Sequence, residues 1–372
     1  MILVITVSIL FIIYSVLVLY YGSAWRSTPN YNKRNQTGTP TKFAVVVAAR
    51  NEEANISQLL TALAAQTYPA DYFEVIVVDD HSQDDTASIA TSFPGVKVIS
   101  LQEEGINSYK KKAIETGIAA TNAQMIVTTD ADCTPGPQWL ETIASFREEA
   151  RAAFIVAPVA MHCNPSILQT FQAMDFMVLQ AITGAAVSTG QLSMCNGANL
   201  AYERNVFYEV GGFSGIDHIA SGDDMLLMHK VSRKYPGSIA YLKSTEAIVD
   251  TQPVKTWKAF FNQRIRWASK ASRYDDKRIF WVLLLVYLFN LAFLVLLIAG
   301  WWNYYYWIFL LLLWVLKTLV ELPLLAHAAD FFNKSWATKL LFFFQPLHIL
   351  YTICAGFFGQ IGKYEWKGRT VR

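Results

Sequence analysis

Charged residues are scarce in this chain. Asp, Glu, Lys and Arg make up 16% of its 372 residues, whereas a soluble globular domain has about 25%. Hydrophobic residues make up 53%, so the deficit of charge indicates that part of the chain lies in lipid. The formal net charge is only +2, which gives no general affinity for nucleic acid.

The sequence also lacks the glycine-rich loops of two large classes of nucleotide-binding enzyme. It has no GxGxxG fingerprint and no Walker loop, which argues against a dinucleotide enzyme and a P-loop ATPase. Its four cysteines, Cys133, Cys163, Cys195 and Cys354, show no CxxC or Cys/His ligand spacing. We expect them to be reduced, buried and to behave as small hydrophobic residues.

Four long apolar runs account for the scarcity of charge. Residues 2–21 contain no charged side chain, and twenty residues in a helix cover about 30 Å, the thickness of a bilayer core. Further runs occupy residues 279–300, 304–326 and 340–359. No positive charge precedes the first run, which is also longer than the core of a signal peptide. We therefore expect an uncleaved N-terminal anchor over residues 1–25.

Basic residues flank the first two runs on the side of the central domain. Arg26, Lys33 and Arg34 follow the first run. A larger basic group precedes the second run: Lys255, Lys258, Arg264, Arg266, Lys270, Arg273, Lys277 and Arg278. Because positive flanks stay in the cytoplasm, we predict a multi-pass protein of the cell membrane whose N-terminus is outside and whose central domain is cytoplasmic.

The C-terminal end conflicts with this simple topology. The tail, residues 363–372, carries four basic residues and one acid, so it should be cytoplasmic. Four full crossings would place it outside. The run 340–359 contains Pro346, Gly356 and Gly359, and we expect it to be re-entrant or packed against protein. The sequence thus predicts two to three C-terminal transmembrane helices over residues 279–362.

The central part, residues 43–278, has the pattern of an α/β domain. Short apolar runs typical of buried strands occupy residues 43–49, 73–78, 96–100 and 125–129. Helical patterns separate them, which indicates a mostly parallel sheet with helices on both faces. Residues 26–42, rich in Asn, Thr and Pro, are predicted to be a linker.

Acidic residues follow three of the predicted strands. They are Glu52 and Glu53, Asp79 and Asp80, and Asp130 and Asp132. An acid after a strand is often only a turn or cap residue. Three such groups at one sheet edge, where open α/β sheets bind ligands, would repel one another. A divalent metal with a diphosphate would relieve this repulsion.

The motifs along residues 48–267 resemble those of membrane-bound family 2 glycosyltransferases, a family of inverting enzymes that includes cellulose and hyaluronan synthases and ceramide glucosyltransferases. The resemblance implies a Rossmann-like GT-A domain with a mostly parallel sheet. It is carried by AARNEEANI (48–56), VVDDHSQDDT (77–86), KKKAIETGI (110–118), TTDADCTP (128–135), NGANLAYERNVFYEVGGF (196–213), SGDDM (221–225) and QRIRW (263–267).

The resemblance also implies a role for each matching residue. Asp224 would be the catalytic base, and Asp132 would bind Mg²⁺ or Mn²⁺. Gly197, Asn199 and Asp223 would belong to the acceptor region, although a turn explains the first two equally well. Asp223 replaces the family's usual glutamate. Nucleotide-sugar contacts would come from Glu52 at the ribose, Asp79 at the base, Lys110 and Asp130 near the nucleotide, and Gln263, Arg266 and Trp267 at the diphosphate and the acceptor end.

The chemistry of sugar transfer requires residues of these types. A cation on carboxylates stabilises the departing diphosphate, an arginine binds phosphate through two hydrogen bonds, and a carboxylate can deprotonate the acceptor hydroxyl. We expect transfer from a nucleoside diphosphate sugar, most simply a UDP-sugar, to a lipid or lipid-linked acceptor in the bilayer. A processive polysaccharide synthase is the alternative, and a membrane component without catalysis is a third.

Overall fold

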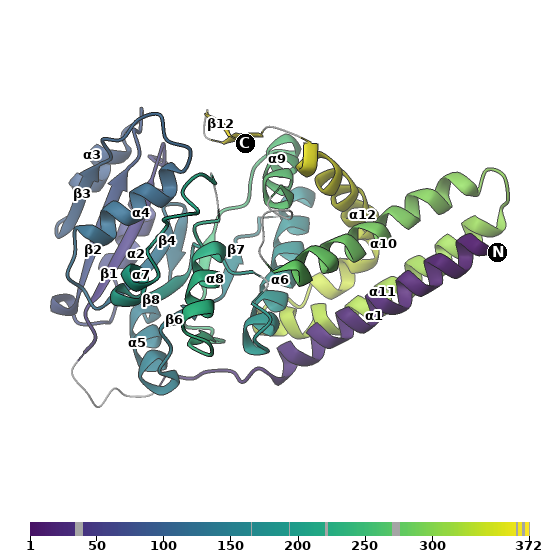
Figure 1. Cartoon of the computed structure of the whole chain (residues 1–372), viewed down its shortest axis with the longest axis horizontal. Coiled ribbons are helices and arrows are strands. Elements are labelled where there is room, and N and C mark those ends of the chain that lie inside the picture. The colour runs from purple at the N-terminus through teal and green to yellow at the C-terminus, as the bar shows by residue number, and fades with distance from the viewer. Residues whose placement is uncertain are drawn as a thin grey trace. The chain divides into compact units, whose positions relative to one another are not determined.

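The computed structural model describes residues 1–33, 40–164, 166–192, 194–219, 222–269, 276–361, 364–366 and 369–371 (Figure 1). The chain divides into two compact units. The helical unit comprises Met1–Ser27, Cys163–Ala185 and Pro253–Glu365, and the sheet unit comprises Thr28–His162, Ala186–Gln252 and Trp366–Arg372. The range 43–278 therefore contributes residues to both units.

A seven-stranded sheet organises the sheet unit. Four parallel strands come first: β3 (Val96–Ser100), β2 (Phe73–Asp79), β1 (Phe43–Ala49) and β4 (Met125–Asp130). The order continues with β8 (Leu200–Glu203), antiparallel to β4, then β6 (Phe154–Val156) and β9 (Ile239–Tyr241). The mostly parallel α/β sheet predicted from the sequence is confirmed.

The register of the central strands brings their carboxyl ends together. Ala49, the last residue of β1, pairs with Asp79 of β2, and Ala48 pairs with Asp130 of β4. The strands are held in register because their side chains are buried on both faces, as the apolar run of β1 requires. Two of the three predicted acidic groups therefore stand at one edge of the sheet.

Helices follow the strands as the sequence pattern predicts. They are α2 (Ile56–Ala64), α3 (Thr86–Thr91), α4 (Tyr109–Ala119), α5 (Trp139–Ala150), α7 (Arg204–Glu209) and α8 (Met225–Lys234), with a 3₁₀ turn, η1 (Ala70–Tyr72). Helix α4 approaches the sheet closely at Gly117, where a Cβ would lie 2.5 Å from Cγ1 of Val46. Gly117 thus sets how near α4, and Lys110 in its first turn, can come to β1.

A small second sheet extends the acidic edge. Strand β5 (Cys133–Pro135) pairs with β10 (Val249–Thr251), which in turn pairs with β7 (Val159–Met161). Because β5 starts three residues after the end of β4, the Asp130–Asp132 segment is fixed on both sides by strands.

The helical unit contains all the long apolar helices (Figure 1). Those long and apolar enough to cross a membrane are α1 (Ile2–Ser27), α10 (Lys277–Ala299), α11 (Tyr305–Phe331) and α12 (Ala337–Ile361). In Figure 1, α1 and α11 run side by side. Two further helices, α6 (Ile167–Ser188) and α9 (Trp257–Ala268), complete the unit. Helix α6 was not expected from the sequence.

Helix α12 bears on the expectation for the last apolar run. We expected residues 340–359, which contain Pro346 and two glycines, to be re-entrant or packed against protein; α12 is one continuous helix through all three residues and packs against α9, α10 and α11. The glycines allow close packing. A Cβ on Gly356 would lie 2.5 Å from the ring of Tyr287 on α10, and one on Gly359 would lie 3.0 Å from Ala268 on α9. The chain therefore has three C-terminal candidate spans.

The ends of the predicted linker and tail are only partly within the described residues. Residues 34–39 of the linker lie outside them, while Tyr31 donates its N–H to the carbonyl of Lys243 at 2.6 Å. In the tail, the main chains of β11 (Tyr364–Trp366) and β12 (Arg369–Val371) pair in a two-stranded sheet. Residues 362–363, 367–368 and 372 lie outside the described residues.

Candidate active site

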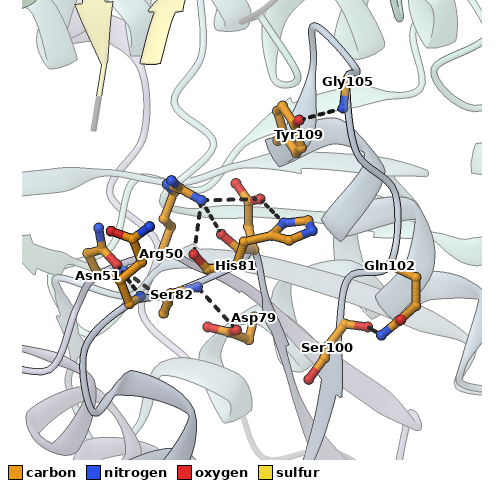
Figure 2. A network of polar contacts seen from close by, with 11 residues as sticks. Arg50, Asn51, Asp79, His81, Ser82, Ser100, Gln102, Gly105 and Tyr109 are labelled. Carbon is orange, nitrogen blue, oxygen red and sulfur yellow. Dashed lines mark hydrogen bonds and ion pairs between the residues drawn. The ribbon is translucent and has the colours of Figure 1, made fainter. Parts of the chain in front are cut away.

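Two loops at the carboxyl ends of β1 and β2 hold each other in place (Figure 2). Arg50 donates from Nη1 to the carbonyls of Asp80, at 2.7 Å, and His81, at 3.1 Å. The N–H of Asn51 donates to Oγ of Ser82 at 3.0 Å. Asn51 and His81 both adopt left-handed backbone conformations, with φ of 50° and 54°. These hydrogen bonds make the two loops one rigid ledge beside the sheet.

Asp79 points an unsatisfied oxygen from this ledge. Its side chain is nearly buried, with 7% of the residue exposed. Oδ2 accepts the N–H of Ser82 at 3.3 Å, but Oδ1 is buried without a hydrogen-bond partner. A buried acceptor without a donor costs about 1–3 kcal/mol. The orphaned oxygen therefore points to a ligand that brings an N–H or O–H donor.

Glu52 lies on the same ledge, after β1. Its N–H donates to Oγ1 of Thr86 at 2.7 Å, and its Oε2 accepts the side-chain amide of Asn55 at 2.7 Å. These contacts fix both the backbone and the carboxylate of Glu52 next to the end of β2. Asp79 and Glu52, which the sequence predicts as base and ribose contacts, thus come from neighbouring strand ends.

Lys110 joins the end of β4 to the loop before α8. Its Nζ lies 2.6 Å from Oδ1 of Asp130 and 3.3 Å from Oδ2 of Asp223. Burial alone would lower the pKa of Lys110, but the carboxylates of Asp130, Asp223 and Asp224 outweigh burial and hold that pKa above its ordinary value. The ammonium is therefore charged and serves as the resident cation among three acids.

Gly197 completes this cluster because it has no side chain. Its N–H donates to Oδ2 of Asp224 at 3.2 Å, and its carbonyl accepts Oγ1 of Thr128 on β4 at 3.0 Å. A Cβ at this position would lie 3.0 Å from Oδ2 of Asp223 and 3.5 Å from Nζ of Lys110. The residues that the sequence assigns to the nucleotide and to the acceptor thus meet at Gly197.

Asp224 and Asp223 differ in their surroundings. Asp224 caps the N-terminus of α8, where its Oδ1 accepts the N–H of Met225 at 2.7 Å. It is partly exposed, whereas Asp223 is buried against Lys110. Asp224 is thus the more accessible of the two acids, while Asp223 is the one that forms an ion pair with Lys110.

Asn199 is placed differently from the rest of the predicted acceptor region. It is completely buried. Its Oδ1 accepts the indole N–H of Trp139 at 2.9 Å, and its Nδ2 donates to the carbonyls of Pro158, at 2.7 Å, and Ala247, at 2.8 Å. With its hydrogen bonds made inside the protein, Asn199 supports the acceptor loop from beneath and does not face a ligand.

The acids after β4 fit a divalent cation shared with a diphosphate. No group of three or more His, Cys, Asp or Glu side chains placed to hold a metal ion occurs among the described residues. Mg²⁺, however, is usually bound by one or two carboxylates together with waters and substrate phosphates. Asp132, beside Asp130, can supply such a ligand. Burial and the carboxylates of Asp132 and Asp130 also raise the pKa of the Cys133 thiol well above its ordinary value, which fits a locally negative site.

Residues 44–211 match the family described as Glycosyl transferase family 2. This match spans just under half of the chain. The chain is 26% identical over 262 residues to a probable glycosyltransferase, YdaM, of Bacillus subtilis, covering 67% of this chain and 59% of that protein. It is 23% identical over 263 residues to the β-monoglucosyldiacylglycerol synthase of Trichormus variabilis, covering 69% of this chain and 54% of that protein. The chain thus spans just over half the length of these relatives.

The fold of the chain has a solved counterpart. The mannosyltransferase PcManGT from Pyrobaculum calidifontis, solved with GDP-mannose and Mn²⁺, superposes with a TM-score of 0.59. The match covers 96% of this chain and 98% of that chain at 17% sequence identity. At such identity the likeness shows the fold, which is GT-A as the sequence resemblance implies.

Two lysines of the sheet unit were not identified from the sequence. Lys111, buried on α4, donates to the carbonyls of Ile216, at 2.8 Å, and Ile219, at 2.5 Å. Lys230 on α8 donates to carbonyls of residues 211, 212 and 214 at 2.6–3.3 Å. Both lysines hold the loop 211–219, which precedes Asp223 and Asp224. Charged side chains that bind only main-chain oxygens leave no signature in the sequence.

The QRIRW segment lies on α9, in the helical unit. Gln263, Arg266 and Trp267 share one side of the helix because residues three and four apart are neighbours on its surface. The sheet unit therefore brings together Lys110, Asp130, Gly197, Asp223 and Asp224, while the three predicted QxxRW contacts belong to the other unit.

Proposed function

We propose that the chain transfers a sugar from a nucleoside diphosphate sugar, most simply a UDP-sugar, to a lipid or lipid-linked acceptor at the cytoplasmic membrane face, with inversion at the anomeric carbon. The observation that carries the proposal is the cluster at the ends of β2 and β4. There the orphaned oxygen of Asp79 and the Lys110–Asp130–Asp223 ion pairs lie on a family 2 glycosyltransferase domain.

The ledge formed by the β1 and β2 loops would bind the nucleoside. The buried Oδ1 of Asp79 needs one donor, and the imide N–H of a uracil supplies one. Glu52, held in place by Thr86 and Asn55, would accept a ribose hydroxyl. A pyrimidine donor is therefore the simplest occupant of this ledge.

Lys110, Asp130 and Asp132 would hold the diphosphate. A bound Mg²⁺ or Mn²⁺ neutralises the charge that develops on the departing nucleoside diphosphate. Asp132 would be its ligand, and Asp130, paired with Lys110 at 2.6 Å, would keep that lysine directed toward the phosphates. Gln263, Arg266 and Trp267 would contribute from α9, the arginine by two parallel hydrogen bonds to phosphate.

Asp224 would remove the proton from the acceptor hydroxyl. Its carboxylate is fixed by the N–H groups of Gly197 and Met225, so it can receive a proton without rearranging. Asp223 is less suited to this role because its charge is already balanced by Lys110. A single displacement assisted by Asp224 needs no enzyme nucleophile and gives inversion.

A lipid acceptor is favoured by the membrane segments and by a relative. Among the described residues, four helices are long and apolar enough to span a membrane, and one similar protein is named a β-monoglucosyldiacylglycerol synthase. A polysaccharide channel would need several polar-lined helices. In the helical unit the polar groups of Tyr14, Lys317, Glu321 and Gln345 bind one another instead. A processive synthase therefore remains the second candidate, supported by the QxxRW motif that such enzymes share. A membrane component without catalysis is disfavoured because Asp224 and Arg266 are both present.

The test is direct. Purified protein in lipid nanodiscs should be incubated with UDP- and GDP-sugars, Mn²⁺ and extracted lipids, with Asp224→Asn as the control. We expect labelled sugar in the organic phase and loss of transfer in excess EDTA. Labelled polymer in the aqueous phase would establish the second candidate, while full turnover in EDTA would exclude the metal. No transfer with any donor would overturn the proposal.

A further inference from the structure

Helix α9 carries two arginines, Arg264 and Arg266. Arg264 is buried and ion-paired with Asp175. We propose that Asp175 on α6 and Tyr351 on α12 are positioning residues, which act through Arg264 to fix Gln263 and Trp267. Arg266 would then be the arginine that binds phosphate. The inference rests on the proposed function, because it gives the QxxRW side chains their orientation for the donor and acceptor.

Arg264 is buried in an ion pair within the helical unit. Its Nη2 lies 2.7 Å from Oδ2 of Asp175, and the two side chains are only 3% and 4% exposed. The other oxygen of Asp175, Oδ1, accepts the hydroxyl of Tyr351 at 2.6 Å. Both carboxylate oxygens are therefore engaged, and three helices, α6, α9 and α12, meet at one charged group.

The same guanidinium contacts two residues of the motif. Its Nη1 donates to Oε1 of Gln263 at 3.3 Å. Its Cζ atom lies over two aromatic rings, 4.2 Å from the centre of the Trp267 ring and 4.9 Å from that of the Phe260 ring. A guanidinium over an aromatic face is an attractive arrangement that also fixes the plane of the ring. The orientation of Gln263 and Trp267 thus depends on where Asp175 holds Arg264.

The two ends of α9 are held by contacts other than the Asp175–Arg264 ion pair, which we call the lock. Thr256 caps the N-terminus, where its hydroxyl accepts the N–H of Ala259 at 3.2 Å. At the other end, Gln360 of α12 donates to the carbonyl of Ala268 at 3.3 Å, next to the close contact at Gly359. Loss of the Asp175–Arg264 pair should therefore loosen the middle of α9, together with its side chains, more than the two ends of the helix.

Stability alone does not account for a buried ion pair. Replacing such a pair by apolar residues of similar size is often neutral or stabilising, because the desolvation of two charges offsets their attraction. A lock that served only to hold α6 and α9 together could thus be apolar. What an apolar pair cannot provide is a planar cation that hydrogen bonds Gln263 and stacks on Trp267.

The experiment uses the full chain in nanodiscs and separates folding from positioning. The key variant is the double substitution Asp175→Leu/Arg264→Met, which removes the lock and leaves no unpaired charge. We expect it to melt within a few degrees of the wild type and to raise the donor KM by ten- to one hundred-fold, since misplacing a binding group by about 1 Å can cost about 100-fold in rate. Near-normal melting with a KM within twofold of the wild type would overturn the proposal.

Tyr351→Phe is the second variant, which decides the matter if the double variant does not fold. It keeps the ion pair but removes one hydrogen bond to Asp175, and we expect a donor KM raised about threefold or more. The matched controls are Tyr287→Phe on α10 and Thr183→Val on α6; the hydroxyl of Thr183 donates to the carbonyl of Leu179 within its own helix. An unchanged KM in Tyr351→Phe would contradict the proposal.

A readout that does not need activity keeps the two proposals apart. Hydrogen–deuterium exchange over residues 257–268 should rise several-fold in Asp175→Asn, with residues 277–299 unchanged. If the wild type transfers no sugar, the proposed function fails while exchange still reports on the lock. If transfer occurs and exchange and donor KM of Asp175→Asn match the wild type, the lock fails alone.

Discussion

Replacing Lys110 with methionine removes the cation between Asp130, Asp223 and Asp224 while keeping most of the side-chain volume. Two unit charges about 3 Å apart attract by about 5 kcal/mol at an effective dielectric constant near 20. Water reduces this value here, because the side chains of Lys110 and Asp130 are 25% and 36% exposed, although that of Asp223 is only 9% exposed.

The net cost lies between two measured limits. Exposed ion pairs contribute about 0–1 kcal/mol, and removing one partner of a buried pair costs about 3–5 kcal/mol. For this partly buried pair of contacts we expect Lys110→Met to lower the free energy of unfolding by about 2 kcal/mol. A domain of this size loses about 2–4 °C in Tm per kcal/mol, so the melting temperature should fall by several degrees.

Lys112→Met provides the matched control on the same helix. Lys112 makes ion pairs with Glu103 and Glu115 at 3.3 and 3.5 Å, and all three side chains are at least 37% exposed. We expect its Tm to change by less than about 2 °C, as a surface pair should. Thermal unfolding followed by differential scanning fluorimetry in detergent measures both variants side by side.

A divalent cation provides a second readout of the same reasoning. Without Lys110, the acids at the end of β4 and before α8 lack their resident cation, so added Mn²⁺ should stabilise Lys110→Met more than the wild type. Sugar transfer should nevertheless fall, because the lysine contact to the diphosphate is lost. If Lys110→Met has the same Tm as Lys112→Met, and Mn²⁺ raises its Tm no more than that of the wild type, the cluster is not the electrostatic centre described above.

Three further predictions follow from the site and the topology. General-base assistance contributes about 10²–10⁴-fold to the rate, so Asp224→Asn should lower kcat by a factor near the upper end of this range. Asp132→Asn should mainly weaken the binding of Mn²⁺ and the donor. Steady-state kinetics separate the two effects, and normal transfer by both variants would refute the mechanism. A reporter enzyme that is active only outside the cell, fused after Ala90, should stay silent; a strong signal would place the domain outside. Burial lowers the pKa of Lys243 to about 8. Since the unfolded chain keeps this proton up to about pH 10.4, the free energy of unfolding should rise between these values, and Lys243→Met should flatten that rise in denaturant titrations at pH 8 and 9.5.

Strands β1 to β4 could be predicted because each is recognisable from its own residues. Residues 43–49 and 96–100 were expected as strands, and β1 and β3 have these bounds, while β2 and β4 each extend one residue further to include Asp79 and Asp130. A continuous apolar run bounded by polar turns has few alternatives. The same runs placed the acids at one edge, since parallel strands end on the same side.

The later strands left no comparable signal. Strands β5, β6, β7, β9 and β10 have only three residues each, too few for any periodicity to show. Helix α6 is mostly apolar but carries polar residues such as Gln172, Asp175 and Gln180, and it is not one of the candidate spans among the described residues. The role of Arg264 could not be predicted from the sequence either. There it is one of a group of basic residues next to an apolar run, which indicates topology. Its burial depends on the ion pair with Asp175, 89 residues earlier in the chain.

An ion pair within one helix lies inside the apolar part of the chain. Lys317 and Glu321, four residues apart on α11, form an ion pair at 2.6 Å. Gln345 of α12 accepts from Lys317 at 2.5 Å and donates to Glu321, which also accepts the hydroxyl of Tyr14 on α1.

If the four apolar helices span a membrane, as proposed above, this arrangement bears on how the protein is assembled during synthesis. Because Lys317 and Glu321 neutralise each other within one helix, α11 can enter a bilayer as a nearly neutral segment, without waiting for another helix to supply a counter-charge. Tyr14, which lies 307 residues before its partner Glu321, is uncharged and can reside in lipid meanwhile. Helix α12 arrives last and brings Gln345, whose amide both donates and accepts. The order of the helices along the chain therefore matches an order of insertion in which no step leaves a lone charge in the membrane.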